Sequence, residues 1–292
     1  MINIIVVCNP SYQKKITHAS NRGDLSHVTQ LIVLYKSILA NWKSIEYDFY
    51  IVCNKHIKWT EADLKRMEQF PNIHRIEVEE SDVKSMPYMT LSPCFTSKLI
   101  RTGTHRMVLN CDMIALSEPV IDYTCDWQGG FATSSVWQQD GVSHKKMMQR
   151  IIDDNNLDVN LDDYAVSNTT YVDYVRNPES YDYKKIFPHI NAGIFFIKEE
   201  LCAKYADLLL KSLKYMNHVH ISVQYIFSVL LIGLSKNWKP FHPGMNFLVK
   251  DISINKFGRE NIGLLHYAGV SEHFRENIYK SQVLPLLKEF SD

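Results

Sequence analysis

A carboxylate and an amide follow a strongly apolar segment near the middle of the chain. The stretch VLNCDMIAL covers residues 108–116, and one residue separates Asn110 from Asp112 within it. If the preceding residues form a strand, both side chains point to the same side of the chain. A hard cation such as Mg²⁺ or Mn²⁺ takes oxygen ligands from one or two carboxylates and completes its shell with water and substrate phosphates. The turn therefore predicts a divalent metal site, although such a triplet alone is also compatible with an Asp that caps the next turn.

Asn110 has a less defined role than Asp112 in this interpretation. Its neutral amide oxygen can ligate a cation weakly, bind it through water, or accept a hydrogen bond from a ribose hydroxyl. The three alternatives remain open from the residue type alone.

Alternating strand-like and helix-like segments position this turn. The expected strands are 2–8, 47–53, 73–78, 106–110 and 190–197, and the expected helices are 26–41, 60–69, 92–101, 199–216 and 221–235. This order predicts an α/β fold with a mostly parallel sheet flanked by helices. Ligands of open α/β sheets bind at the carboxyl ends of the strands, where the turn lies. Residues 138–187, rich in Asp, Asn and Tyr, predict surface loops or a small helical insertion.

Composition limits the classes of partner. The 292 residues carry 32 basic and 32 acidic side chains, so no general field favours nucleic acid or an anionic membrane. The six scattered cysteines form no C-x-x-C pair, which indicates reduced thiols. The chain passes directly into its first strand without a leader-like segment, and its longest apolar run is about half the ~20 residues that span a bilayer. We therefore expect a cytoplasmic protein of one domain without a transmembrane segment.

Several common catalytic signatures are absent from the sequence. The first strand is followed by CNPSY (8–12) rather than by a glycine-rich phosphate loop, which argues against a dinucleotide site and a P-loop. The chain also contains no G-x-S-x-G elbow and no HExxH helix.

The remaining motifs occur together in a known order. CNPSY follows the first strand, Lys98 lies in the helix before the VLNCDMIAL strand, INAGIFFI covers 190–197, and HYAG covers 266–269. With the Asn110–Asp112 turn, this series resembles the GT-A glycosyltransferases, most closely the retaining family 8 group that includes glycogenin and bacterial galactosyltransferases. The resemblance extends over most of the chain. It implies a single GT-A domain over 1–292, with a nucleotide-binding half at 1–137 and an acceptor-side half at 138–292.

The resemblance assigns the metal and nucleobase contacts. Asp112, His266 and Asn110 would hold Mn²⁺ or Mg²⁺, and the imidazole favours Mn²⁺. Asn9 would bind the edge of uracil and Tyr12 would stack on it. Taken singly, His266 is more typical of a core histidine bonded to backbone, and Tyr12 is equally compatible with a buried tyrosine.

Further residues are assigned to the diphosphate. Lys98, with Arg101 on the same helical face, would reach the donor phosphates, and Gly269 would let the backbone approach them. A solvated pair of charges and a simple turn are the respective alternatives.

The donor sugar would be lined by the strand at 190–197 and the helix at 221–235. Asn191 and Gln224 are the predicted catalytic residues, Gln224 lying near the anomeric carbon, while Ala192 and Gly193 leave room for the ring. Asn246 matches a later asparagine of the family. For Gln224 the alternative is a glutamine bonded to a neighbouring carbonyl.

Three positions depart from the family pattern. Asn110 and Val223 stand where the family usually has carboxylates, and Glu272 stands where it has a lysine. Loss of the Asp at Val223 removes a ligand of sugar hydroxyls, so a deoxy sugar is one explanation. Glu272 would face the diphosphate with the wrong charge unless His273 or Arg275 compensates for it.

These motifs predict a metal-dependent glycosyltransferase that moves a sugar from a UDP-sugar to a hydroxyl acceptor such as a glycan, with retention of configuration. Inversion would need a general base, for which the acidic residues of 138–187 offer Asp140, Asp153, Asp154, Asp162 and Asp163. The alternatives are a catalytically silent nucleotide-sugar-binding protein and a sugar-phosphate nucleotidyltransferase. The sequence leaves the sugar, acceptor, linkage and oligomeric state open.

Overall fold

A seven-stranded sheet forms the centre of the protein. The computed structural model describes residues 1–8, 26–55, 59–70, 72–78, 102–131, 137–164, 174, 176–180, 182–215, 220–249, 253–267 and 276–291. The strand order is β3-β2-β1-β4-β7-β6-β8. The strands are β1 (Ile2–Val7), β2 (Tyr47–Asn54), β3 (Ile73–Val78), β4 (His105–Leu109), β6 (Trp127–Phe131), β7 (Ile190–Lys198) and β8 (Trp238–Pro240). Only β7 runs antiparallel to its neighbours within this sheet, so the predicted mostly parallel α/β sheet is confirmed.

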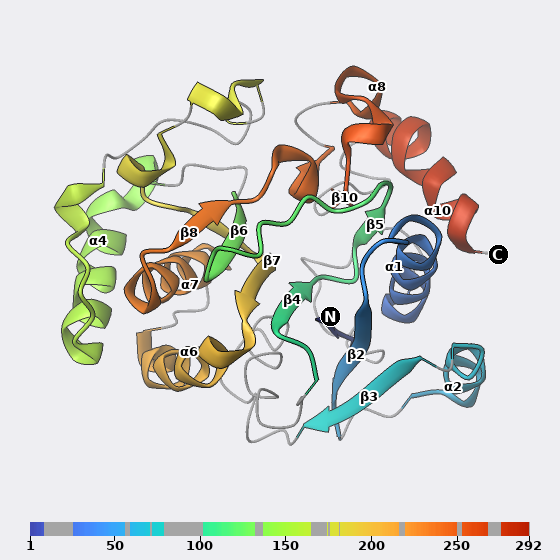
Figure 1. Cartoon of the computed structure of the whole chain (residues 1–292), viewed down its shortest axis with the longest axis horizontal. Helices are drawn as coiled ribbons and strands as arrows, with labels where there is room; N and C mark the ends of the chain where they lie inside the picture. Colours follow the sequence, from blue (N-terminus) through green and yellow to red (C-terminus); the bar gives the residue numbers. More distant parts are fainter. Residues whose placement is uncertain are drawn as a thin grey trace.

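Helices cover the sheet in two groups. The long helices are α1 (His27–Asn41), α2 (Glu61–Met67), α4 (Trp137–Asn155), α6 (Glu199–Ser212), α7 (His220–Leu234) and α10 (Leu284–Ser291). The shorter ones are η4 (Leu161–Asp163), η5 (Pro178–Ser180), η6 (Tyr183–Lys185), η7 (Leu213–Tyr215), η8 (Pro243–Asn246), α8 (Ile254–Phe257), η9 (Arg259–Asn261), α9 (Glu276–Ile278) and η10 (Tyr279–Val283). Figure 1 shows α4, α6 and α7 gathered beside β6, β7 and β8, with α1 and α10 packed together at the other side of the molecule.

The side chains of β7 alternate between two cores. Phe195 and Ile197 pack into a cluster with α4, α6 and α7. Ile194 and Phe196 pack into the cluster that contains β1 and α1. This alternation is the period of two expected for a strand covered on both faces, and it explains why INAGIFFI reads as an almost continuous apolar run.

A second, three-stranded sheet begins directly after the Asn110–Asp112 turn, the predicted metal site. Its order is β5 (Met113–Ala115), β10 (Leu264–His266) and β9 (Phe247–Leu248). Helix α1 holds β5 from one side, because the buried Ser37 hydroxyl accepts from Ala115 N at 2.9 Å and Asn41 Nδ2 donates to Ala115 O at 3.0 Å. The turn at Asp112 therefore lies between two fixed strands, β4 and β5.

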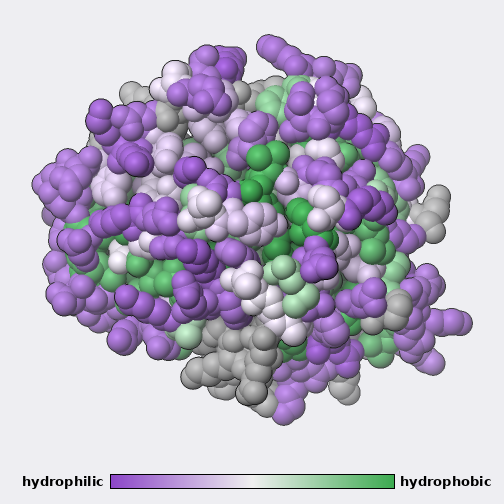
Figure 2. Space-filling view, in the orientation of Figure 1, coloured by the Kyte–Doolittle hydropathy of each residue, from purple (hydrophilic) through white to green (hydrophobic). Residues whose placement is uncertain are grey.

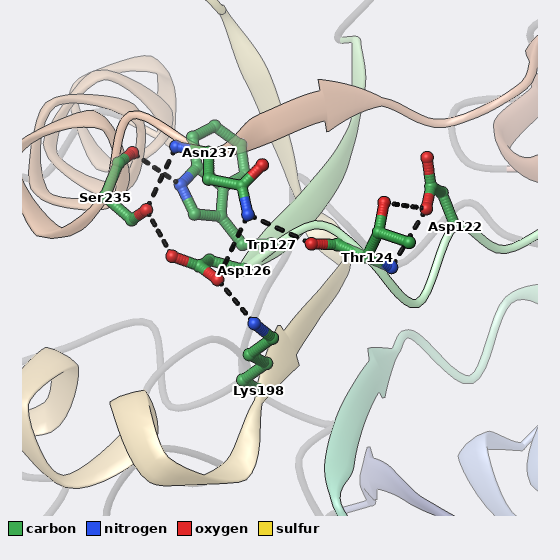
Figure 3. A network of polar contacts seen from close by, with 7 residues as sticks. All are labelled: Asp122, Thr124, Asp126, Trp127, Lys198, Ser235 and Asn237. Atoms are coloured by element: carbon green, nitrogen blue, oxygen red, sulfur yellow. Dashed lines mark hydrogen bonds and ion pairs between the residues drawn. The ribbon is translucent and has the colours of Figure 1, made fainter.

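Ion pairs fix the end of the main sheet that lies away from this turn. Arg106, 1% exposed at the start of β4, binds Glu199 at the start of α6. Figure 3 shows a second network there, in which the Asp126 carboxylate accepts from Lys198 Nζ at 2.7 Å and Ser235 Oγ at 2.6 Å. Asn237 Nδ2 joins it by donating to Thr124 O and Asp126 Oδ1. The network ties the start of β6, the end of β7 and the α7–β8 connection.

Figure 2 shows one face of the molecular surface. This face is mostly hydrophilic, with apolar residues gathered near its centre. Within the described residues, no helix combines the length and apolarity needed to cross a bilayer.

The predicted elements that fall in described residues are present with boundaries shifted by a few residues. The short strands β5, β6, β8, β9 and β10 were not predicted from the sequence. In the segment 138–187, for which loops or a helical insertion were expected, the structure has the long helix α4 followed by short 3₁₀ turns. The helix expected at 92–101 lies outside the described residues.

The network of Figure 3 predicts how Asp126→Asn acts. Burial raises the pKa of the Asp126 carboxyl, but hydrogen bonds from Lys198 and Ser235 outweigh it and lower the pKa overall. The carboxylate therefore stabilises the fold fully above the unfolded-state pKa of about 3.9, and the contribution is lost as pH falls through the folded-state value. We expect Asp126→Asn to lower the free energy of unfolding by about 1–2 kcal/mol at neutral pH, as measured by urea denaturation.

The difference between wild type and Asp126→Asn should shrink below about pH 4. Asp207→Asn, at an exposed position of α6, is the matched control and should leave stability unchanged at neutral pH. A constant difference down to pH 2 would contradict the assignment to the ionised carboxylate.

Candidate functional site

Asp112 and His266 come from distant parts of the chain and meet between the two sheets. Their side chains are 1% and 2% exposed, and His266 Nε2 lies 3.4 Å from Asp112 Oδ1. Main-chain pairing causes this contact: His266 pairs with Met113 across the antiparallel β5–β10 ladder, and Tyr267 N donates to Asp112 O at 3.1 Å. The sequence-predicted metal ligands Asp112 and His266 are therefore neighbours.

Two amides contact the other nitrogen of the His266 ring. Asn246 Oδ1 lies 3.1 Å from His266 Nδ1, and Asn191 Nδ2 lies 3.2 Å from the same atom. Asn246, 2% exposed, ends η8, and Asn191 is the second residue of β7. The imidazole is therefore held between Asn191 of β7, Asn246 of η8 and the Asp112 carboxylate.

Asn110 lies on the β7 side of the turn. Asn110 N donates to Gly193 O at 2.9 Å, and a Cβ at Gly193 would come within 2.2 Å of Asn110 Nδ2 and 3.1 Å of Asn191 Oδ1. The absence of a side chain at Gly193 thus lets the two amides lie against the same backbone position. Within the described residues, the Asn110 side chain forms no hydrogen bond to Asp112 or His266.

Gln224 is tied to the start of β7 through a buried serine. Ile190 N donates to Ser228 Oγ at 3.0 Å, and Ser228 Oγ donates to Gln224 O at 2.7 Å. The Gln224 side chain is partly exposed in the second turn of α7, and no hydrogen bond joins it to another described residue. The serine bridge therefore fixes where Gln224 lies relative to Asn191.

The donor set fits a divalent cation. His266 Nε2 is a buried nitrogen with no hydrogen-bond partner among the described residues, because the 3.4 Å contact with Asp112 lacks hydrogen-bond geometry. Adjacent ligands of an octahedral ion with bonds of about 2.1 Å are about 3 Å apart, which is close to the observed separation. Within the described residues no three His, Cys, Asp or Glu side chains converge. A cation here would therefore need further oxygen donors from amides, water or substrate.

Two buried thiols, Cys8 and Cys111, lie next to the turn. Cys111 Sγ donates to Val7 O at 3.1 Å, and both Cys8 and Cys111 are buried. The hydrogen bond with Cys111 and burial raise the pKa of Cys8 well above its ordinary value. The thiol of Cys8 therefore stays protonated at neutral pH.

Other sequence-predicted residues fall outside the described part of the chain. These are Asn9, Tyr12, Lys98, Arg101, Gly269 and Glu272, together with the side chains of Asp140 and Val223. Their roles remain predictions.

The described acidic residues of the insertion are exposed and engaged with other surface groups. Asp154 binds Lys214 and Tyr215, Asp162 binds Lys145, and Asp153 accepts from Gln149. None of these partners belongs to the cluster around His266.

Three residues that were not predicted from the sequence position the side chains of the site. Ser228 bridges β7 and α7, the Phe131 carbonyl accepts from Asn246 Nδ2 at 3.1 Å, and Gly130 makes room for Asn246, since a Cβ at Gly130 would lie 2.6 Å from Asn246 Cβ. The adjacent glycines 129 and 130 were a usable signal, because glycine inside a strand often marks a close approach of another segment.

Gly244, which lies in η8 together with Asn246, packs tightly against the backbone of Asn261. A Cβ at Gly244 would lie 1.9 Å from the Asn261 backbone oxygen, which cannot move without shifting the chain. We expect Gly244→Ala to lower the free energy of unfolding by about 2–3 kcal/mol, measured by urea denaturation. In the control Gly263→Ala the new methyl meets the flexible Met245 Sδ at 2.6 Å, so the loss should be smaller. Equal losses would contradict the steric explanation.

Comparisons with known proteins identify structures with a similar fold. No protein-family model matches the sequence, and no curated protein matches it. The structure is similar to the galactosyltransferase LgtC in complex with donor and acceptor sugar analogues, with a TM-score of 0.56 and 12% identity over 100% of this chain and 96% of that one. A glutamine-to-glutamate active-site mutant of LgtC matches with a TM-score of 0.57 and 13% identity over the same shares.

A third match is the glycosyltransferase GlyE of Streptococcus pneumoniae TIGR4, with a TM-score of 0.50 and 12% identity over 99% of this chain and 60% of that one. At these identities the similarity establishes the fold and leaves donor, acceptor and activity open. The α/β fold expected from the motifs is confirmed: the chain has a GT-A-like fold similar to that of these glycosyltransferases.

Proposed function

We propose that this protein is a metal-dependent glycosyltransferase that uses a nucleotide-sugar donor, with a UDP-sugar as the expected one. The main support is the contact between Asp112 and His266, 3.4 Å apart and almost fully buried beside the carboxyl end of β4. A carboxylate and an imidazole in this arrangement suit Mn²⁺, with Mg²⁺ as the alternative. In a GT-A fold this is the place where a donor diphosphate would sit.

Each residue then has a defined task. A bound cation would stabilise the negative charge that develops on the leaving diphosphate. Asp112 and His266 would hold the cation, and Asn110, directed toward Gly193, would bind water or a ribose hydroxyl. Asn191 would donate to a sugar hydroxyl, and Gln224, fixed through Ser228, would contact the sugar near its anomeric carbon. The acceptor would be a hydroxyl of a glycan, and the configuration would be retained.

A catalytically silent nucleotide-sugar-binding protein is the second candidate, and Asn110 is the observation that favours it. An amide in place of a carboxylate leaves Asp112 as the one acidic side chain of the described cluster. A weaker hold on the cation lowers transition-state stabilisation more directly than it lowers the binding of a nucleotide.

Thermal stability in the presence of UDP and Mn²⁺ tests the metal assignment. A ligand that binds only the folded state at about 100 times its Kd stabilises it by about 2.7 kcal/mol, or roughly 5 °C in a chain of this size. We expect Mn²⁺ to raise the melting temperature in the presence of UDP, and Asp112→Asn to abolish that increment. Asp207→Asn should retain it. An undiminished increment in Asp112→Asn would show that Asp112 does not hold the metal.

An assay of donor turnover then distinguishes the glycosyltransferase from the silent binding protein and from a nucleotidyltransferase. An enzyme hydrolyses or transfers from at least one nucleotide sugar in a donor screen with Mn²⁺, and Asp112→Asn removes that activity. Metal-dependent UDP binding without turnover of any donor favours the silent protein. Release of pyrophosphate from UTP and a sugar phosphate would identify a nucleotidyltransferase instead.

A further inference from the structure

Two asparagines make opposite hydrogen-bonding demands on one nitrogen of His266. Asn246 presents its carbonyl oxygen to Nδ1 at 3.1 Å, which requires a hydrogen on Nδ1. Asn191 presents its amino group to the same Nδ1 at 3.2 Å, which requires a lone pair there. Only one of these contacts is a hydrogen bond at any moment in a neutral ring.

The backbone fixes the orientation of both amides. Asn191 Oδ1 accepts from Gly193 N at 2.9 Å, so its amino group must face the ring. Asn246 Nδ2 donates to Phe131 O at 3.1 Å, so its oxygen must face the ring. Rotating either amide by half a turn would oppose donor to donor or acceptor to acceptor on the backbone side. The conflict at Nδ1 therefore cannot be removed by exchanging oxygen and nitrogen in either side chain.

The contact between Nε2 and Asp112 determines which of the two hydrogen bonds at Nδ1 can form. A neutral imidazole carries its single hydrogen on Nδ1 or on Nε2. With the hydrogen on Nε2, the ring faces the Asp112 carboxylate with a donor and accepts from Asn191 at Nδ1. With the hydrogen on Nδ1, the ring donates to Asn246 and directs the Nε2 lone pair at Asp112, which is unfavourable unless a cation lies between them.

We propose that His266 is a metal-driven tautomer switch, held by Asn191 in its metal-free form and by Asn246 in its metal-bound form. In the metal-free form the hydrogen is on Nε2. When a cation binds Nε2 and Asp112, the Nε2 proton leaves to solvent and Nδ1 takes one up, so no net proton is released. The proposal rests on the proposed function only in taking a divalent cation as the trigger.

The switch links the metal to the donor sugar. In the metal-bound form Nδ1 carries a hydrogen and no longer accepts from Asn191. The Asn191 side chain stays in place because Gly193 N still holds its oxygen. Its amino group then becomes available to an incoming hydroxyl, so cation binding prepares a donor for the sugar. By linkage, a ligand that engages this amino group also favours the cation.

Mn²⁺ affinity tests the switch through variants with effects of opposite sign. Asn246→Leu removes the acceptor of the metal-bound form, and we expect it to weaken Mn²⁺ binding by about 10- to 100-fold. Asn191→Ser removes the donor of the metal-free form, and we expect it to strengthen Mn²⁺ binding by about fivefold, the equivalent of one ordinary hydrogen bond. The readout is the electron paramagnetic resonance signal of free Mn²⁺, first with the metal alone and then with UDP. A merely structural role for either asparagine would weaken binding in both variants.

The tautomer itself can be read by nitrogen NMR of histidine-labelled protein at about pH 8, where an ordinary imidazole is neutral. The His266 signals are assigned by their absence in His266→Gln. We expect the Nε2–H pattern without metal and the Nδ1–H pattern with Mg²⁺ and UDP. Asn191→Ser should shift the metal-free protein toward Nδ1–H, and Asn246→Leu should keep it in the Nε2–H form.

Gln128→Leu is the matched control, because Gln128 is a buried amide whose Oε1 accepts from Asp122 N at 2.8 Å, outside the His266 cluster. It should lower stability while leaving Mn²⁺ affinity unchanged. If Asn246→Leu does not fold, the Mn²⁺ affinity and the metal-free tautomer of Asn191→Ser carry the test. The same tautomer with and without Mg²⁺, a doubly protonated ring, or affinity changes of the same sign in both asparagine variants would each overturn the switch.

The two hypotheses fail separately. If no cation binds, the proposed function fails, while the metal-free tautomer of Asn191→Ser still reports on the opposed amides. If sugar transfer occurs without a change of tautomer, the enzyme stands and the switch is wrong.

Discussion

The main-chain pairing of β10 with β5 is the constraint on which the site depends. It places His266 opposite Met113, and the adjoining Tyr267 N–Asp112 O hydrogen bond brings the imidazole onto the carboxylate. Both strands have only three residues, so the pairing itself is short. Its stability comes from burial, because Ile114 and Leu265 pack with Phe247, Val283 and Leu286 in one apolar cluster, while α1 holds the Ala115 backbone from the other side. The C-terminal helices thus support the site through apolar contacts.

The electrostatics of the cluster follow from its burial. A carboxylate removed from water needs a compensating charge or several hydrogen bonds, and the imidazole of His266 lies 3.4 Å from the Asp112 carboxylate. A divalent cation between Asp112 and His266 would add positive charge beside this carboxylate. Because Asn110 is neutral, such a cation would keep more of its own charge than between two carboxylates. That residual charge is best met by a diphosphate, which makes joint binding of cation and nucleotide the natural state of the proposed enzyme.

The sequence predicted those features that depend on long periodic segments or on residue type. The strands at 2–8 and 190–197 and the helices at 26–41 and 221–235 are long enough for their apolar pattern to identify them. The strands β5, β8, β9 and β10 have two or three residues, too few for any periodicity, and they exist only because distant segments pair. Asp112, His266, Asn191 and Asn246 could be selected by type and motif. The contacts among them could not be predicted, since they depend on the register of those short strands.

Charge is distributed unequally between the two ends of the main sheet in the described residues. The end away from Asp112 has three ion pairs, in which each carboxylate is paired with a Lys or Arg side chain: Arg106–Glu199, Asp126–Lys198 and Asp122–Lys239. The cluster around His266 consists instead of neutral amides and one carboxylate. Paired charges satisfy each other and stabilise the fold, whereas neutral amides oriented by backbone groups leave their remaining donors and acceptors for a charged ligand. The ion pairs at the far end therefore contribute to stability, whereas the amides around His266 would serve the proposed ligand, so a substitution such as Asp126→Asn can lower stability without changing ligand recognition.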